Sequence, residues 1–182
     1  MKHTQLDLFD SRKGLDRGKL KIIEMIWYFS KRVFFLTSFP WPNTIQLTVL
    51  KVFGAKVGRK INIKPRVNIH LPWKLEIGDH TWIGEEVFIL NFEPVTIGSN
   101  VCISQRAFLC TGNHDYRAED FAFRNAPISI ADGGWIGAQC FVGPGVNIGR
   151  ETVATAGSVI NQSLPENKIC TGNPCIPIKD RW

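Results

Sequence analysis

An aliphatic residue, usually branched, recurs at every sixth position along most of this chain, and this spacing restricts the fold more than any other feature. The copies before residue 110 are Val57, Ile63, Ile69, Ile77, Ile83, Ile89, Ile97, Ile103 and Leu109. The copies after residue 127 are Ile130, Ile136, Val142, Ile148, Ala154 and Ile160. An ordinary β-sandwich repeats every two residues and sustains no period of six, so the spacing predicts a parallel β-helix.

Three six-residue units complete one coil of a triangular prism, because each unit supplies a short strand and a corner. The spacing predicts an all-β solenoid of about five coils in a single domain of 182 residues. Glycine often follows the aliphatic residue, which suits backbone that turns or takes a positive φ. These glycines are Gly58, Gly78, Gly84, Gly98, Gly137, Gly143 and Gly149.

The chain divides into a polar tail (1–18), a helical cap (19–56) and the β-helix (57–182), which ends in a C-terminal tail at 164–182. The apolar stretch from Lys19 to Phe39 predicts a helix that Pro40 ends. Asn43 is expected to cap a second helix that runs through Phe53. Because a solenoid needs an element over its open end, we expect both helices to lie there.

A competing hypothesis for the cap is contact with a membrane. Glu24 and the pair Lys31-Arg32 interrupt the apolar stretch, which leaves it well short of the about 20 residues that span a bilayer. Peripheral contact with the cytoplasmic face of the inner membrane stays open. It would use the basic pair and the aromatic residues Trp27, Phe34 and Phe35.

Charge and cysteine usage narrow the class of protein. The net charge of +6 comes without a nucleic-acid motif, so a nucleic-acid partner is not expected. Five cysteines, an odd number without a CxxC pair, favour a reducing cytoplasm over a disulfide framework. The first twenty residues are polar and do not resemble a signal peptide. No histidine pair has metal-ligand spacing, so no metal site is expected.

Two extra residues stand between Ile69 and Ile77 and between Ile89 and Ile97, and the period is lost altogether only after Leu109, at Thr111-Gly112-Asn113-His114-Asp115. The following loop, 115–127, is polar and out of register, and an insertion at a solenoid corner usually builds a binding face. Neutral imidazole accepts a proton from a hydroxyl near pH 7, so His114 is the candidate general base. Asp115 or a backbone carbonyl is expected to fix its tautomer. The competing interpretation is a polar corner residue without a catalytic role.

Several phrases carry a resemblance beyond the spacing. They include Pro72-Trp73-Lys74-Leu75-Glu76-Ile77-Gly78-Asp79, Pro94-Val95-Thr96-Ile97-Gly98-Ser99-Asn100, Cys110-Thr111-Gly112-Asn113-His114-Asp115-Tyr116 and Gly172-Asn173-Pro174-Cys175. Over residues 57–178 the chain resembles the hexapeptide-repeat acyltransferases, and most of all the acetyltransferases assigned to colanic acid and related exopolysaccharide synthesis. The resemblance implies a left-handed parallel β-helix and a homotrimer with active sites between subunits.

The resemblance also implies an acetyl-CoA-dependent O-acetyltransferase that acts on a hydroxyl of a sugar or glycan acceptor. His114 matches the general base of related sugar acetyltransferases, and Asn91 matches the asparagine that holds the acceptor. Asp115 and Tyr116, at the start of the insertion, are further candidates for contacting the sugar. This acceptor loop spans 115–127.

The resemblance implies that acetyl-CoA lies in a groove between two prisms. The positions that match its contacts are Trp135, Gly137, Ala138, Ala156, Gly157 and Ser158. The chain departs from the family where cations usually meet the nucleotide phosphates. Asn161-Gln162 and Ile176 stand at those places, so Asn161 is kept as a candidate by position and Lys179 as a substitute cation.

Two other functions stay open. An N-acyltransferase that acts on an aminosugar nucleotide is chemically close, and a non-catalytic scaffold would explain the missing cations. A zinc carbonic anhydrase with the same prism would need three converging histidines, which this chain lacks. Whether the acceptor is nucleotide-linked, lipid-linked or free does not follow from the residues.

Overall fold

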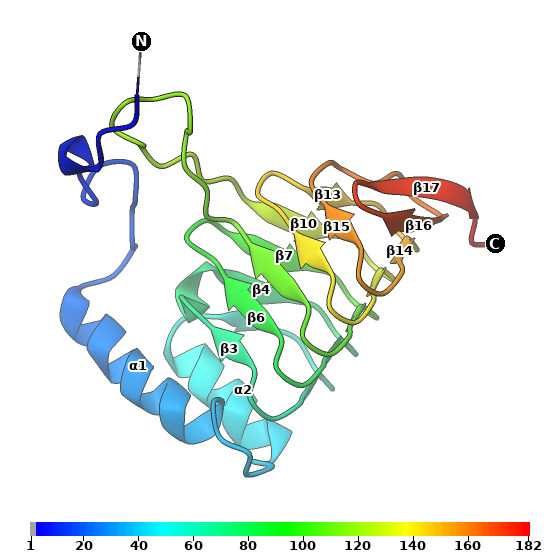
Figure 1. Ribbon diagram of the computed structural model, residues 1–182. Coiled ribbons are helices and arrows are strands. Elements are labelled where there is room, and N and C mark those ends of the chain that lie inside the picture. Colours follow the sequence, from blue (N-terminus) through cyan, green and yellow to red (C-terminus); the bar gives the residue numbers. More distant parts are fainter. Residues whose placement is uncertain (1–2) are drawn as a thin grey trace.

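The chain folds into a three-sided solenoid with two helices at its N-terminal end, as a computed structural model that describes residues 3–182 shows (Figure 1). Sheet A holds β1 (Lys56–Val57), β4 (Leu75–Ile77), β7 (Val95–Ile97), β10 (Ile128–Ile130) and β13 (Asn147–Ile148). Sheet B holds β2 (Asn62–Ile63), β5 (Trp82–Ile83), β8 (Cys102–Ile103), β11 (Trp135–Ile136), β14 (Val153–Ala154), β16 (Lys168–Gly172) and β17 (Cys175–Asp180). Sheet C holds β3 (Asn68–Ile69), β6 (Phe88–Leu90), β9 (Phe108–Cys110), β12 (Phe141–Val142) and β15 (Val159–Ile160).

The predicted solenoid is confirmed, with five complete turns and part of a sixth, which begins at Leu164 and β16. Within sheet A, Ile77 pairs with Ile97 and Ile97 pairs with Ile130, so equivalent aliphatic residues stack along the axis. All three are at most 3% exposed. The period of six therefore marks the side chains that face the interior of the prism.

Close packing between turns requires most of the glycines after the inward aliphatic residue, with Gly143 as an exception. A Cβ on Gly84 would lie 2.7 Å from the backbone nitrogen of Gln105, and one on Gly137 would lie 2.5 Å from that of Ala156. The positive φ falls two residues later, on a residue with a side chain such as Glu86, whose φ is 59°. The expectation of a positive φ at these glycines is wrong. A side chain is excluded there by backbone atoms of the next turn, not by the φ of the glycine itself.

Helices α1 (Lys21–Phe34) and α2 (Asn43–Val52) precede the solenoid, and short 3-10 turns lie at Leu6–Leu8 and Pro72–Lys74. The helix predicted to reach Phe39 ends at Phe34, since Phe35 leaves the helical conformation. α2 packs on β1 and β2 of the first turn.

Asn43 does not cap α2, contrary to expectation. Its side-chain oxygen accepts a hydrogen bond from the backbone N–H of Ile63 at 2.8 Å, and its amide nitrogen lies 3.3 Å from Oδ1 of Asn62. The side chain thus ties the helix to the first turn of the solenoid. The prediction was wrong because this partner lies twenty residues away, outside the local pattern.

α1 packs on the first turn through polar side chains. The Trp27 indole N–H donates to the carbonyl of His70 at 2.9 Å, and the Lys31 ammonium donates to Oδ1 of Asn68 at 2.9 Å. Glu24 pairs with Arg17 of the tail. The buried face of α1 therefore includes two charged residues, and large apolar side chains of the same helix face solvent.

The expected C-terminal tail, 164–182, continues sheet B. β16 pairs in parallel with β14 and antiparallel with β17, so the chain ends in a hairpin at one end of the prism (Figure 1). This pairing was not predicted because the aliphatic residues of β17 follow a period of two, unlike the rest of the solenoid.

Candidate active site

The insertion, residues 111–127, leaves the prism at the corner between sheets C and A and folds back on itself (Figure 1). His114 forms an antiparallel bridge with Phe123, and the N–H of Asp115 donates to the carbonyl of Ala122 at 2.8 Å. The N–H of Asn113 donates to Oδ1 of Asn125 at 3.0 Å. These bonds join the two limbs of the insertion to each other, and the N–H of Thr111 ties its first residue to the preceding turn by donating to the carbonyl of Leu90 at 3.0 Å.

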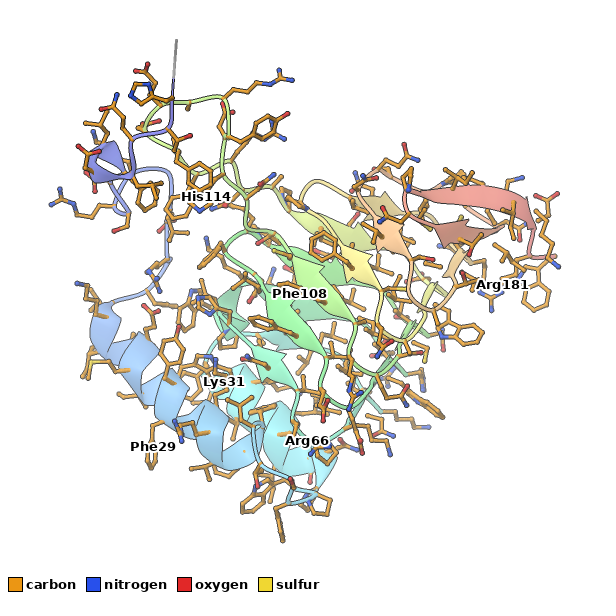
Figure 2. The ribbon with its side chains drawn as sticks, in the orientation of Figure 1. Phe29, Lys31, Arg66, Phe108, His114 and Arg181 are labelled. Atoms are coloured by element: carbon orange, nitrogen blue, oxygen red, sulfur yellow. The ribbon has the colours of Figure 1, made fainter. Side chains whose placement is uncertain are left out.

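A backbone carbonyl orients the His114 ring. Nδ1 of His114 lies 2.7 Å from the carbonyl oxygen of Phe121, and because a carbonyl only accepts, Nδ1 carries the hydrogen. In the neutral imidazole the lone pair is then on Nε2. The ring stacks on Phe121 with centroids 4.3 Å apart and planes 8° apart, and Phe123 lies 4.8 Å away. The half-buried ring lies outside the prism, at the base of the insertion (Figure 2).

The N-terminal tail forms part of this environment. The edge of Phe9 packs on the His114 ring at a centroid distance of 5.4 Å and on Phe123 at 5.1 Å. The N–H of Gln5 donates to the carbonyl of Glu119 at 2.7 Å. Within the predicted tail 1–18, Gln5 and Phe9 therefore contact the insertion, whereas the carbonyls of Asp16 and Arg17 accept hydrogen bonds from Lys74 and Trp73 of the solenoid. Residues 1 and 2 fall outside the described part of the chain.

Neither Asp115 nor Tyr116 makes the contact that orients the His114 imidazole. Oδ1 of Asp115 accepts a hydrogen bond from the backbone N–H of Arg117 at 3.0 Å, which closes a local turn. The tautomer of His114 is thus fixed by the carbonyl of Phe121. Tyr116 is 66% exposed, with the Arg117 guanidinium 5.5 Å from its ring.

Asn91, expected to hold the acceptor, is fully buried. Its Oδ1 accepts from the N–H of Leu71 at 2.8 Å, and its amide donates to the carbonyl of Leu71 at 2.6 Å. Both ends of the side chain are therefore bonded to the preceding turn. In this structure Asn91 therefore packs between turns, and its contact with an acceptor stays a prediction.

An open cavity of about 480 Å³ connects the insertion with the last turns of the solenoid. Its lining includes Asn113 and Arg124 from the insertion, Phe141 of β12 and Asn161, which follows β15. Asn161 therefore lines the same cavity as Asn113, the residue before His114, although Asn113 and Asn161 are far apart in sequence. Polar side chains from the insertion and from the last turn of the solenoid therefore line one cavity.

Most of the residues that match acetyl-CoA contacts gather at the corner between sheets B and C. The N–H of Gly157 donates to the carbonyl of Ala138 at 2.8 Å, which places two consecutive turns of small residues side by side. A Cβ on Gly157 would meet no atom within 4 Å, so this corner is open to an extended ligand. Ser158 is buried, and its hydroxyl accepts from the N–H of Gly172 at 3.2 Å.

Trp135 and Gly137 are the other matched residues, and Lys179 is the substitute cation. Trp135 on β11 is 48% exposed, and its indole N–H donates to the hydroxyl of Ser104 at 3.0 Å. Gly137 lies directly below Ala156 of the next turn. Lys179 on β17 is exposed and forms no ion pair within residues 3–182.

The other C-terminal cation is already bonded. Arg181 donates to the carbonyl of Gly133 at 2.8 Å and lies 3.1 Å from a carboxylate oxygen of Glu151. Lys179 is therefore the better candidate for a ligand's phosphate.

The cysteine nearest the insertion is unsuited to act as a nucleophile. Burial raises the pKa of the Cys110 thiol, and this thiol lies 3.3 Å from the carbonyl of Gly112 as a donor. A thiol with a raised pKa carries little thiolate at neutral pH. Histidine chemistry is thus favoured over a covalent thioester on the protein.

Sequence reasoning missed two contributors to this site, the Phe9 ring and Asn125. It gave a backbone carbonyl as the alternative to Asp115 for fixing the tautomer of His114, without identifying Phe121. Phe9 lies more than one hundred residues from His114, and no local pattern links the two.

Among residues 3–182, no three His, Cys, Asp or Glu side chains gather as a metal site would require. No helix in that range is long and apolar enough to cross a bilayer.

Comparison with known proteins identifies relatives along nearly the whole chain. No protein-family model matches. The Escherichia coli (strain K12) protein named "Putative colanic acid biosynthesis acetyltransferase WcaF" is 37% identical over 177 residues, covering 95% of this chain and 94% of the relative. Galactoside O-acetyltransferase of the same organism is 29% identical over 136 residues, covering 73% of this chain and 67% of the relative.

A solved structure shares the fold. The hexapeptide-repeat acetyltransferase of Vibrio cholerae O1 biovar eltor, complexed with acetyl coenzyme A, has a TM-score of 0.80 and 25% sequence identity to this chain. The match covers 92% of each chain.

Proposed function

Since the chain belongs to the hexapeptide-repeat acetyltransferase family, we propose that it transfers an acetyl group from acetyl-CoA to a sugar hydroxyl in exopolysaccharide biosynthesis. The 37% identity with WcaF over 95% of the chain supports the biosynthetic role. The relative that acts on galactosides supports a sugar acceptor and oxygen as the acetylated atom.

The hydrogen bond between Nδ1 of His114 and the carbonyl of Phe121 is the observation that carries the mechanism. It leaves the Nε2 lone pair to accept the proton of a hydroxyl. The stack on Phe121 and the edge contact with Phe9 hold the ring in place, so little orientational freedom is lost when an acceptor binds.

The proposed reaction is a direct transfer. The acceptor oxygen attacks the thioester carbonyl carbon and forms a C–O bond, while the hydroxyl proton passes to Nε2 of His114. The C–S bond breaks, and the proton moves from Nε2 to the departing sulfur. The products are the O-acetyl sugar and free CoA thiol, and the imidazole returns to its neutral form.

The corner between sheets B and C fits the thioester arm of the donor. Ala138, Ala156 and Gly157 leave backbone accessible without bulky side chains, and Trp135 provides an apolar wall beside them. Gly137 is buried below Ala156 and lets the two turns pack closely there. Across β15, Asn161 lies at the cavity that reaches the root of the insertion. Lys179 is the cation proposed to meet the nucleotide phosphates.

We also propose that the active unit is a homotrimer, in which a second chain closes the site. Phe88, Phe108 and Phe141 form a ladder on the outer face of sheet C, with ring centroids 4.8 Å and 5.5 Å apart. Half-buried aromatic rings in such a row suit an interface with another prism. Light scattering should give three times the chain mass of 20.5 kDa.

Replacement of the base tests the mechanism. His114→Ala should lower kcat by about 10²- to 10⁴-fold, measured as thiol release from acetyl-CoA with a panel of sugar acceptors, because a general base contributes about that much. The matched control is His80→Asn. His80 is an exposed corner residue with φ 59°, and Asn tolerates that conformation.

The outcomes separate the alternatives. Turnover by His114→Ala near that of the wild type would show that another group takes the proton. Faster transfer to aminosugars than to their hydroxyl analogues would favour an N-acyltransferase. Absence of acetyl-CoA binding in calorimetry would favour a scaffold.

A further inference from the structure

The outer face of α1 is a row of large apolar side chains in contact with solvent. Ile22, Met25, Ile26 and Phe29 are 58%, 66%, 52% and 72% exposed, and Val33 continues the row at 37%. Their spacing of three and four residues places them on one side of the helix. Figure 2 shows Phe29 on the side of α1 away from the solenoid and Lys31 on the side facing it.

The orientation of α1 is fixed by its inner face. Trp27 is fully buried, Lys31 bonds to Asn68, and Glu24 pairs with Arg17. Rotation of the helix to bury the apolar row would break all three contacts and leave charges unpaired. The exposed row, which we call the apolar face of α1, therefore stays outside in the folded chain.

Cations surround this face. Lys19, Lys21 and Arg32 are exposed, and none of them forms an ion pair within the described residues. Lys19 and Lys21 also line a cavity of about 750 Å³ between α1 and the tail, where Met25 of the apolar face forms part of the wall. An apolar strip edged by unpaired cations matches the interface of a bilayer that carries anionic lipids.

We propose that α1 lies flat on the surface of an anionic bilayer. The apolar face enters the boundary between head groups and acyl chains, and Lys19, Lys21 and Arg32 contact lipid phosphates. The helix has 14 residues and a length of about 21 Å, which suits an orientation in the plane of the membrane. A second copy of the chain would bring the same cations together, so charge favours the bilayer as occupant.

The proposal does not depend on the acetyl-transfer reaction, and vesicle flotation tests it directly. The full chain should float with vesicles of phosphatidylcholine mixed with phosphatidylglycerol, and far less with phosphatidylcholine alone. Met25→Glu/Phe29→Glu should lower the partition coefficient by about tenfold or more, because two large apolar groups no longer enter the lipid. Lys19→Glu/Lys21→Glu should weaken binding and reduce its sensitivity to salt.

The matched control is Ile178→Glu, which changes a 55% exposed aliphatic residue on β17, in the hairpin remote from α1 (Figure 1). It should float as the wild type does, and thermal unfolding followed by circular dichroism should show that every variant is folded. Failure of the wild type to float with anionic vesicles would overturn the proposal. So would unchanged flotation of the Met25/Phe29 variant, or a lower oligomeric mass for that variant in light scattering, which would assign the apolar face to a second copy.

Discussion

The wall of the solenoid and the insertion at 111–127 hold their polar groups by different means. Along the wall, corner groups bond to the equivalent corner of the next turn. The N–H of Asp79 donates to the hydroxyl of Ser99 at 3.0 Å, and the N–H of Ser99 donates to Oδ1 of Asp132 at 2.8 Å. In the insertion, His114 bonds to a carbonyl seven residues away and touches a ring from the N-terminal tail.

This difference shows where each region is free to vary. A wall residue must fit the same position one turn above and one turn below, so the repeat limits it from both sides. A residue in the insertion has partners that occur once. The insertion can therefore hold a reactive side chain in an environment that the repeat could not provide.

Replacement of Asn91 gives the largest expected effect on stability. It tests whether a residue that matches an acceptor contact instead holds the wall of the solenoid together. Asn91→Ala should lower the free energy of unfolding by about 2–4 kcal/mol, since it empties space and leaves the N–H of buried Leu71 without a partner. Denaturant unfolding measures the loss, and exposed Asn161→Ala is the control for stability. A stable Asn91→Ala variant with a raised KM for the acceptor would instead place this side chain in the binding site.

Gly84→Ala tests the packing between turns. We expect a loss of about 1–3 kcal/mol in the free energy of unfolding, because the new Cβ would lie 2.7 Å from the Gln105 nitrogen and 3.0 Å from the Ile103 oxygen. Gly143→Ala is the control, since its Cβ would be no closer than 3.4 Å to any neighbour. Equal stability of the two variants would contradict the assigned role of glycine.

Phe9→Ala tests the contribution of the tail to the insertion. The His114 ring loses one edge contact, so kcat should fall by about three- to tenfold while the KM for acetyl-CoA stays unchanged. Melting temperature should change little, because the contact lies outside the prism. Leu8→Ala, at an exposed position of the same tail, should leave kcat unaltered; a similar fall in both variants would point to a general effect of the tail.

His70 gives the smallest expected effect on stability, and this effect is confined to acidic pH. Burial, together with nearby Lys31 and Arg17, lowers the pKa of His70 from 6.5 to about 4, and its Nε2 is buried without a hydrogen bond. The unfolded chain thus binds a proton between these values while the folded chain does not. The stability contributed by neutral His70 is present above pH 6.5 and is lost as pH falls toward 4.

Melting temperatures across this range provide the measurement. His70→Gln should remove part of the decline seen in the wild type and should change little above pH 6.5. An identical decline in both proteins would show that other groups account for it.

The spacing of six predicted the solenoid because each inward residue repeats under the same packing constraint. Ile77, Ile97 and Ile130 could be assigned to the interior without knowing their contacts. His114 stood out for the opposite reason, since it lies where the period fails. Both conclusions need only the order of residues along the chain.

The remaining features depend on partners that are distant in sequence. The burial of Lys31 follows from Asn68, and that of Asn91 follows from Leu71. No local pattern reveals that Phe9 reaches His114. These contacts were missed because burial and hydrogen bonding between remote segments decide them.

The reversed strand β17 has a consequence for assembly. It runs against every other strand of sheet B, and Pro177 within it has no N–H to donate. A prism whose last rung stayed parallel would offer a template on which another prism could grow. In sheet B the hairpin removes that template, and α2 lies over the first strands of sheets A and B at the opposite end. End-to-end fibre growth is therefore disfavoured, and association is directed to the sides of the molecule.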